Sequence, residues 1–357
     1  MSHALPPPSA EAQLAFLNQL QRLFAEGDFV ATYKFSLLIA LADLAVELGG
    51  DDGNGLELSV RQIARRFIQN YWHQALPFST GKPHLRVGVL YQNLGEKQAA
   101  VITAIQEFKA QYGNPTFVQA CKHLAFEKLV SKVATTVSAQ PLNYLQNFGG
   151  TTTAFLYERQ HGLVRLLPCV PFYLRRFYPL VQHLARSHWI EHIKRNHRNR
   201  PILGDTGDLE SFLFETPKKT LDKVSKALLK LDGAKCFYCE ERLTTAHVDH
   251  FIPFSKYPRD ITQNFVLAHA RCNTSKSNAL ASEKHLQRWL ERLNQHAPDL
   301  VSIAEEAGVI NDAQVMLRVA QWSYSNAASS DGKAWVRPTV FEPITTQYLR
   351  HFSRTMA

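Results

Sequence analysis

Two cysteines and an acid–imidazole pair lie close together in "CFYCEERLTTAHVDHFIPFSK", residues 236–256. Two residues separate Cys236 from Cys239, and Asp249 and His250 follow ten residues after Cys239. Thiolates at this spacing bind zinc, whereas a carboxylate beside an imidazole can hold a divalent ion and accept a proton from water. The segment is therefore either a structural zinc knuckle followed by an unrelated histidine or one half of a catalytic metal site.

The second half is found in "NFVLAHARCNTSK", residues 264–276. His269 and Cys272 repeat the two-residue gap, so the four side chains suit a closed, tetrahedral zinc site. Zinc motifs usually separate their ligand pairs by about 15 to 20 residues. Here thirty positions separate Cys239 from His269, and the Asp-His pair lies between them. This spacing predicts a structural zinc clip built around a second site.

A strand that ends in Asp249-His250 and a helix that begins near Asn273 would suit phosphodiester hydrolysis. The imidazole can deprotonate water, while a carboxylate and an amide oxygen hold one divalent cation on the scissile phosphate. Lys276 lies one helical turn after Asn273 and can neutralise a phosphate oxygen from the same face. Because neighbouring strand residues point to opposite faces, Asp249 and His250 can meet one metal–water unit only if the strand bends there.

These residues resemble the HNH nucleases, the ββα-metal or His-Me finger family, in the form that carries a zinc clip. The resemblance covers residues 222–280. It rests on the Asp-His pair with Ile and Pro after it, on Asn264 fourteen residues after His250, on Asn273 nine residues later and on Lys276 three further on.

The resemblance implies that His250 is the general base, that Asp249 and Asn273 hold a catalytic magnesium or manganese ion, and that Asn264 braces the loop behind His250. It also implies a structural zinc ion, held by Cys236, Cys239, His269 and Cys272. Two positions differ from the commonest family pattern. Asn273 replaces a frequent histidine, as is typical of magnesium-dependent members, and His269 replaces a frequent cysteine.

The composition is that of a soluble globular chain. Of its 357 residues, 45% are hydrophobic and 20% are charged. No apolar run approaches the ~20 residues that span a bilayer, and the N-terminal "MSHALPPPSAEAQ" lacks the apolar core of a secretory signal, so we expect a short disordered tail there and no membrane association. Three of the five cysteines lie within residues 236–272, which favours metal binding in a reducing compartment over disulfides. We therefore expect a cytoplasmic protein.

Basic residues point to an anionic partner. The net charge is +9, and residues 172–200 contain seven Lys/Arg against one acid. Such a segment suits contact with a nucleic-acid backbone, through Lys194, Arg195 and Arg198 together with Lys276 of the second motif, but it equally suits a solvated helix face. Family precedent favours DNA over RNA.

Hydrophobic periodicity predicts an α+β chain. We expect a helix-rich domain of unknown role at residues 1–200 with a basic last helix, a linker at 201–216, the HNH domain at 217–281, and a helical segment at 282–357 that packs on it. Within the first domain, "ATYKFSLLIALADLAVELGG" predicts a central core helix, and "TTTAFLYERQHGLVRLLPCVPF" predicts a hairpin at His161-Gly162. The last segment, "WVRPTVFEPITTQYLRHF", suits a strand followed by a helix.

Together these patterns predict a metal-dependent endonuclease that cleaves DNA. One alternative is a non-catalytic zinc module that docks on nucleic acid, which would need the four zinc ligands but not Asp249, His250 and Asn273. Another is an interaction subunit whose N-terminal residues sense a partner or signal. A helical domain before an HNH unit resembles nucleases of prokaryotic anti-phage and restriction systems, and that resemblance implies protein partners in a defence complex.

Overall fold

The computed structural model describes residues 5–148, 150–204 and 209–355. The chain forms two compact units, the N-terminal unit Met1–Glu215 and the C-terminal unit Thr216–Ala357. Helices dominate and the strands form small sheets, which confirms the predicted α+β class. Among the described helices, none combines the length and the apolar character that crossing a bilayer requires.

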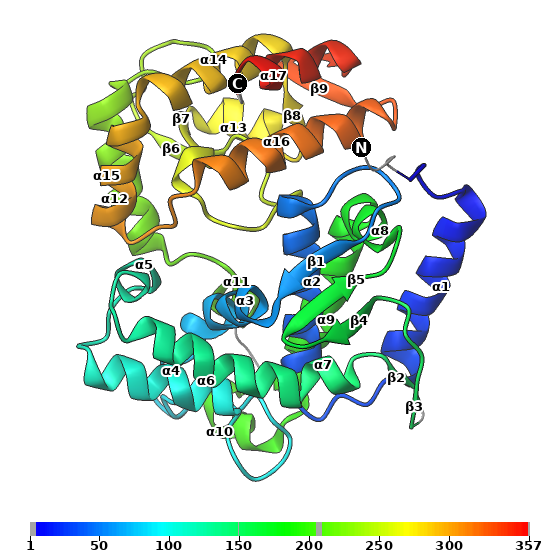
Figure 1. Ribbon diagram of the computed structural model, residues 1–357. Helices are drawn as coiled ribbons and strands as arrows, with labels where there is room; N and C mark the ends of the chain where they lie inside the picture. The colour runs from blue at the N-terminus through cyan, green and yellow to red at the C-terminus, as the bar shows by residue number, and fades with distance from the viewer. Residues whose placement is uncertain (1–4, 149, 205–208, 356–357) are drawn as a thin grey trace. The chain divides into compact units, whose positions relative to one another are not determined.

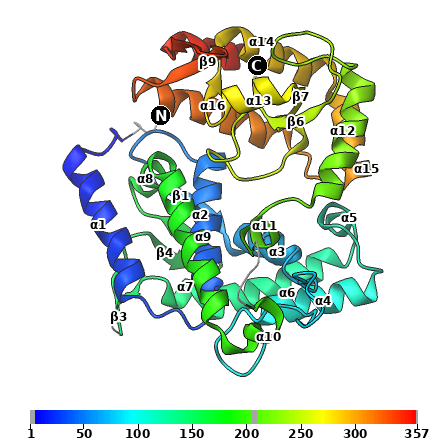
Figure 2. The ribbon, with the colours of Figure 1, turned by 180° about the vertical axis from the view of Figure 1, so that it is seen from behind.

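The N-terminal unit is built around one buried helix, α2 (Tyr33–Leu48), whose residues from Lys34 to Glu47 are all buried. This confirms the central core helix that its apolar sequence predicts. Figures 1 and 2 show α2 in the middle of the unit, where it contacts α3, α8 and α9. The other helices are α1 (Ala10–Glu26), α3 (Val60–Trp72), α4 (Ala100–Gln111), α5 (Phe117–Cys121), α6 (Phe126–Ala139), α7 (Pro141–Tyr144), α8 (Val170–Arg176), α9 (Tyr178–Arg195), α10 (Arg200–Leu203) and α11 (Leu209–Phe214).

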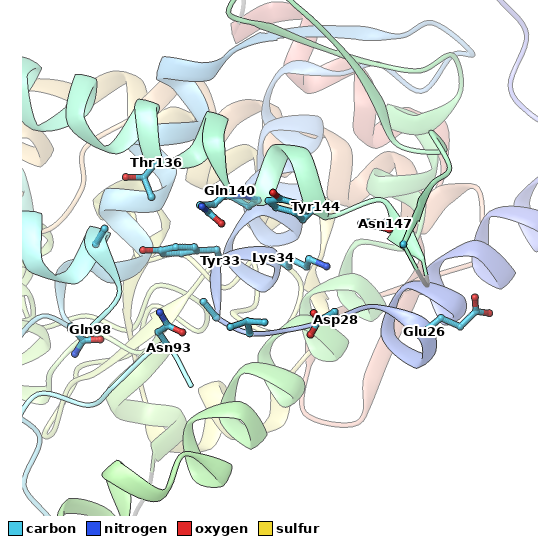
Figure 3. A pocket seen from close by; sticks show the side chains of 15 residues that line it. Glu26, Asp28, Tyr33, Lys34, Asn93, Gln98, Thr136, Gln140, Tyr144 and Asn147 are labelled. Carbon is cyan, nitrogen blue, oxygen red and sulfur yellow. The ribbon is translucent and has the colours of Figure 1, made fainter. Parts of the chain in front are cut away.

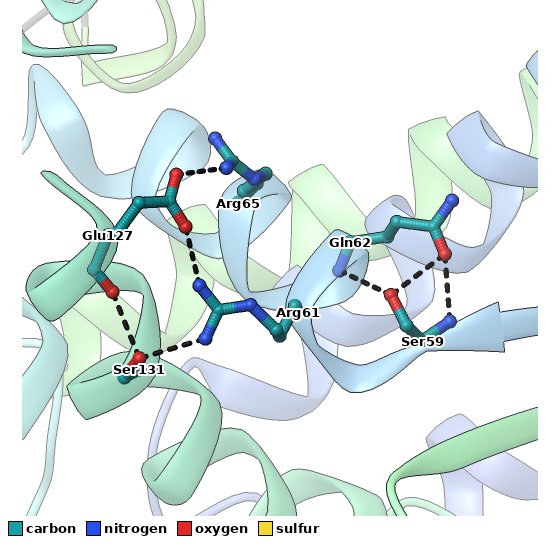
Figure 4. Close-up of polar contacts among 6 residues, drawn as sticks. All are labelled: Ser59, Arg61, Gln62, Arg65, Glu127 and Ser131. Carbon is teal, nitrogen blue, oxygen red and sulfur yellow. Dashed lines mark hydrogen bonds and ion pairs between the residues drawn. The ribbon is translucent and has the colours of Figure 1, made fainter. Parts of the chain in front are cut away.

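Helix α3 shows how sequence signals define the elements of this unit. Ser59 caps it by accepting a hydrogen bond from the Gln62 N–H at 3.2 Å, while the Gln62 side chain accepts one from the Ser59 N–H at 2.8 Å (Figure 4). Arg61 and Arg65 then both pair with Glu127 of α6. These ion pairs are about half exposed, so they align α3 with α6 and add little stability, about 0–1 kcal/mol each.

A small antiparallel sheet completes the unit, in the order β1 (Leu56–Ser59), β5 (Leu163–Leu166), β4 (Tyr157–Gln160). The β4–β5 turn lies at His161-Gly162, where both residues have positive φ (44° and 81°), so the predicted hairpin is confirmed. A second, two-stranded sheet pairs β2 (Asn147–Phe148) with β3 (Thr151–Thr152).

The segment expected to be a linker, residues 201–216, is helical in its described parts. α10 ends at Leu203, and α11 follows at Leu209–Phe214 because Leu209 and Leu213 are buried in the N-terminal unit. Residues 205–208 lie outside the described residues. The same holds for residues 1–4 of the expected N-terminal tail.

The C-terminal unit surrounds a two-stranded sheet of β6 (His247–His250) and β7 (Phe265–Ala268), which is followed directly by α13 (Ala270–Lys276). Its other helices are α12 (Lys218–Asp232), α14 (Glu283–Gln295), α15 (Ala297–Ala307), α16 (Ala313–Ala328) and α17 (Arg350–Thr355), with the 3₁₀ turns η2 (Thr262–Asn264) and η3 (Thr346–Leu349). The helical segment expected at 282–357 also holds β9 (Lys333–Arg337) and β10 (Val340–Pro343), a hairpin whose β9 pairs in parallel with β8 (Leu280–Ala281).

Two tryptophans join the C-terminal elements to the β6–β7 region. Trp289 of α14 is fully buried, stacks on Phe251 at 4.7 Å and donates its indole N–H to the Gln263 carbonyl at 2.9 Å. Trp335 of β9 donates its N–H to the Ser275 hydroxyl at 3.0 Å, one residue before the end of α13. The loop after β6 and the short helix α13 therefore each rest on a rigid aromatic support.

Candidate active site and metal centre

Cys236, Cys239, His269 and Cys272 form one cluster, with ligand atoms all within 4.8 Å of one another. The first pair lies on a turn closed by the bridge between Lys235 and Arg242, and the second pair lies at the start of α13, where His269 is the N-cap. A tetrahedron with bonds of about 2.3 Å has edges of about 3.8 Å. The separation of 3.3 Å between Cys239 Sγ and His269 Nδ1 is compatible with those edges, so this Cys3His set fits zinc.

The imidazole of His269 is oriented for a metal. Its Nε2 lies 3.1 Å from the Arg242 carbonyl, to which it can donate, and this leaves Nδ1 facing Cys239 with a free lone pair. Metal-binding histidines usually donate their second ring nitrogen to a carbonyl in this way.

Two of the thiols in this cluster have pKa shifts of opposite direction. Burial raises the pKa of the Cys236 thiol, but the backbone N–H groups of Cys239, His269 and Tyr238 outweigh burial and bring the pKa below its ordinary value. Burial and the charges of Cys236 and Cys239 raise the pKa of Cys272 to about 12. A divalent cation is what such a donor set needs in order to hold every thiolate deprotonated.

Asp249 lies on β6 opposite Val266, and its side chain is only 8% exposed. Its Oδ2 accepts a hydrogen bond of 2.5 Å from the Tyr238 hydroxyl and lies 3.1 Å from Lys276 Nζ. Tyr238 lies between Cys236 and Cys239 in the sequence. Its side chain therefore connects the Cys3His cluster, called the zinc-type cluster below, to the Asp249 carboxylate. Tyr238 was not predicted from the sequence, although its place between Cys236 and Cys239 was the available signal.

Lys276 corrects one expectation. Its side chain is fully buried, and Nζ donates to the His250 carbonyl at 2.9 Å besides pairing with Asp249. Burial lowers the pKa of Lys276 and the charge of Asp249 opposes that shift. The ammonium therefore connects α13 to the end of β6, where the Asp249 carboxylate and the His250 carbonyl are its partners. It is buried and does not extend toward the surface, where a phosphate would lie.

His250 ends β6 and turns to a different partner from Asp249. Its Nε2 lies 2.5 Å from Asp260 Oδ1, and its ring packs between Phe254 and Phe265 at 5.2 and 5.0 Å. When Nε2–H donates to the carboxylate, Nδ1 carries the lone pair. Within the described part of the chain Nδ1 has no hydrogen-bond partner, and the side chain is 21% exposed, so this nitrogen is available to a water molecule.

Asp260 is a site residue that the sequence analysis missed. Burial pushes its pKa upward, but the hydrogen bond and charge of His250 and two hydrogen bonds from Thr216 outweigh burial and leave the pKa below its ordinary value. The group is therefore a carboxylate that fixes the tautomer of His250. The available signal was that Asp260 is the sole acid in the segment between His250 and Asn264.

The two asparagines have different surroundings. Asn264 is fully buried, and its amide donates to the Ile252 carbonyl at 2.9 Å and accepts from the Ile252 N–H at 2.7 Å, so it holds the backbone just after His250. Asn273 is partly exposed on α13, one turn before Lys276. Its side-chain amide makes no hydrogen bond to any described residue, which leaves the amide oxygen open to a hard cation such as magnesium.

The expected nucleic-acid contacts at the end of α9 and in the 3₁₀ turn η1 (His197–Asn199) that follows it divide into two kinds. Lys194 and Arg195 are exposed, and Arg195 lies 3.6 Å from Glu191. The Arg198 guanidinium instead bonds the carbonyls of Asn93, Leu94 and Glu96 and stacks over Tyr91 at 4.4 Å. Arg198 is therefore a structural tie to the loop before α4, which corrects its expected role.

Comparison with known proteins finds two families in the chain. The family described as a domain of unknown function, DUF8808, matches residues 13–201, and the family described as HNH endonuclease matches residues 236–279. The second match includes the four zinc-type ligands and every residue from Asp249 to Lys276. No curated protein and no solved structure matches the chain.

Proposed function

We propose that this chain, which belongs to the DUF8808 family and carries an HNH endonuclease domain after that region, is a metal-dependent nuclease that hydrolyses phosphodiester bonds of DNA. One observation carries the proposal. At the end of β6, His250 is held by a buried carboxylate with one ring nitrogen free, directly beside Asp249. A zinc module that only docks on nucleic acid has no need of such a pair.

In this proposal His250 is the general base. Asp260 accepts a hydrogen bond from Nε2–H and stabilises the imidazolium that forms when Nδ1 takes a proton from water. Asn264 keeps the backbone after His250 in place through Ile252, so the imidazole stays at the end of the strand. Water is the nucleophile, and no covalent intermediate with the protein forms.

Asp249 and Asn273 supply the oxygen ligands for a catalytic magnesium or manganese ion. Such an ion, when bound, stabilises the negative charge that grows on the phosphate and on the leaving 3′ oxygen. Tyr238 and Lys276 hold Asp249 Oδ2, and no described residue bonds Oδ1. We assign the Cys3His cluster to a structural zinc ion, because its donors are complete without water or substrate.

The substrate, the location, the biological role and the nucleic-acid contacts of the proposed nuclease are inferred from the sequence and the family. Family precedent favours DNA over RNA. The cysteines are five in number and three of them are clustered, which supports a cytoplasmic location. The helical region before an HNH unit supports a role in a prokaryotic anti-phage or restriction system with protein partners. Lys194 and Arg195 are proposed to contact the nucleic-acid backbone, and the nuclease domain is proposed to span residues 217–281.

The test is cleavage of supercoiled plasmid, single-stranded DNA and RNA by the purified full-length chain, each with magnesium, manganese or a chelator. We expect plasmid cleavage with magnesium or manganese and none with the chelator, and products with 5′-phosphate and 3′-hydroxyl ends. Tight binding to all three substrates without cleavage under any metal would instead support the non-catalytic zinc module.

A further inference from the structure

A pocket of about 820 Å³ opens in the N-terminal unit, separate from the proposed nuclease site, whose residues all belong to the C-terminal unit. Figure 3 shows its walls, which come from the start of α2, from Gln140 and Tyr144 at α7, and from the segment around Asp28. Pockets of roughly 300–1,000 Å³ hold small organic ligands. This pocket is large enough for such a ligand, and the chemistry of its lining residues indicates which kind.

The first turn of α2 faces this pocket without a cap. Thr32 is the N-cap residue, but its hydroxyl bonds Tyr71 at 2.7 Å and Gln92 at 3.0 Å and makes no cap bond to the helix. Among the described residues, no acceptor bonds the N–H groups of Tyr33, Lys34 and Phe35. Uncapped N–H groups and the positive end of a 16-residue helix favour an anion.

Lys34 supplies an independent sign of a ligand. It is only 7% exposed, it lines the pocket, and no acceptor of the described residues bonds its ammonium, which lies 5.3 Å from the centre of the Phe29 ring. Burial lowers the pKa of Lys34, and the charge of Asp28 only partly opposes that shift. The Phe29 ring and the Asp28 charge stabilise the ammonium only in part, because burial still outweighs them, so a negatively charged group that binds here is expected to complete its pairing.

The remaining lining residues suit a ligand with a planar ring that carries polar groups. Tyr33 and Tyr144 offer aromatic rings, and the side-chain amide of Gln140 makes no hydrogen bond to a described residue. Asn147 also lines the pocket, and its buried Oδ1 has no hydrogen-bond partner among the described residues.

We propose that this pocket binds a nucleoside monophosphate. The phosphate lies at Lys34 and the first N–H groups of α2, and the base lies against Tyr33 and Tyr144 with Gln140 at its polar edge. Asp28, exposed at the mouth, is placed to accept hydrogen bonds from ribose hydroxyls, which carboxylates commonly do. The other acid of the lining, Glu26, is already paired with Arg22 at 2.9 Å and does not oppose the phosphate.

Isothermal titration calorimetry on the full-length chain tests this inference, with adenosine, guanosine, cytidine and uridine 5′-monophosphates, the four matching nucleosides, and inorganic phosphate. We expect at least one monophosphate to bind one-to-one with a Kd below about 1 mM. Lys34→Met keeps the buried stem and removes the charge, and it should weaken that monophosphate at least about tenfold while hardly changing the weak binding of its nucleoside. Lys132→Met, at an exposed lysine of α6 paired with Glu107, is the matched control and should bind like wild type.

The outcomes separate the inference from its rivals. Because Lys34→Met removes a buried charge and loses only the cation–π contact with Phe29, the variant should unfold near the wild-type temperature. If that variant does not fold, Gln140→Leu tests the wall instead and should weaken monophosphate and nucleoside alike. The inference is overturned if no monophosphate binds, if inorganic phosphate binds as tightly as the best monophosphate, or if Lys34→Met and Gln140→Leu both bind like wild type. None of these readouts uses nuclease activity, so they stand apart from the proposed function.

Discussion

His250 and Asp249 are neighbours in sequence, yet each is held by a separate set of contacts. Asp260 and two phenylalanines hold the imidazole, whereas Tyr238 and Lys276 hold the carboxylate. The alternation of side chains along β6 accounts for this division, and the expected bend follows directly after the strand, at Phe251 and Ile252. In the proposed mechanism His250 can therefore accept the proton and Asp249 can bind the metal without competing for the same hydrogen bonds.

Asp260→Asn is predicted to slow cleavage without weakening substrate binding. The amide can still contact His250, but it cannot stabilise the imidazolium that forms as water is deprotonated. We expect kcat to fall by about 10- to 10²-fold, part of the ~10²- to 10⁴-fold that a general base contributes, with KM nearly unchanged. Steady-state cleavage of plasmid measures both constants.

The matched control for Asp260→Asn is Asp299→Asn. Asp299 forms another aspartate–histidine pair, with His296 at 3.2 Å on the exposed surface of the same unit. This variant should cleave at the wild-type rate. A parallel rise of KM in Asp260→Asn, or an unchanged kcat, would show that Asp260 does not act through His250.

At the scale of elements, the seven-residue helix α13 serves two sites. Its start presents His269 and Cys272 to the zinc-type cluster, and its later turn presents Asn273 and ties Lys276 to β6. A helix this short has little stability of its own. Metal binding at its start is therefore expected to fix the position of Asn273 as well.

Cys239→Ser is predicted to lose zinc and stability together. Structural zinc contributes on the order of 10 kcal/mol in small zinc peptides, and each kcal/mol lost lowers the unfolding temperature of a unit of this size by about 2–4 °C or more. The unfolding temperature of the C-terminal unit should therefore fall by at least ~20 °C, and activity should fall with it. Elemental analysis and thermal unfolding give the two readouts. Cys121→Ser, at an exposed cysteine outside the cluster, should keep about one zinc per chain. A metal-free wild-type protein would contradict the structural assignment.

Helix α9 carries the prediction on nucleic-acid binding. Lys194→Ala with Arg195→Ala should weaken unrelated DNA sequences about equally, because phosphate contacts position a protein without reading bases. The slope of log K against log salt should shrink by up to about 0.9 for each phosphate of duplex DNA that the variant no longer neutralises. Lys128→Ala with Lys132→Ala on α6 is the control. An unchanged slope would make α9 a solvated face, and Arg198→Ala should act differently, by lowering stability.

Local spacing made part of this site predictable. The Cys-x-x-Cys turn and the His-x-x-Cys helix start are short-range features, so the zinc-type cluster followed from the sequence and is confirmed. Contacts that depend on tertiary packing did not follow. The burial of Lys276 requires β6 to lie against α13, the Asp260 contact requires the loop between the strands to fold back, and the Arg198 contacts require the loop before α4.

For the whole molecule, the two units carry different chemistry. The C-terminal unit holds the HNH match and the proposed active site, and the N-terminal unit holds the DUF8808 match, the pocket at Lys34 and the basic end of α9. The N-terminal unit offered no motif in its sequence because its features, an uncapped helix start and an unpaired buried lysine, exist only once the fold has formed.

The central claim is that His250 deprotonates the attacking water, and the most direct test is plasmid cleavage by His250→Ala under magnesium. The account predicts a loss of about 10²- to 10⁴-fold with zinc content, unfolding temperature and DNA binding unchanged, because the imidazole is assigned to neither metal. His247→Ala, at an exposed histidine on the same strand, should cleave like wild type. Cleavage by His250→Ala at the wild-type rate would contradict the assignment and favour a zinc module that binds nucleic acid without cutting it.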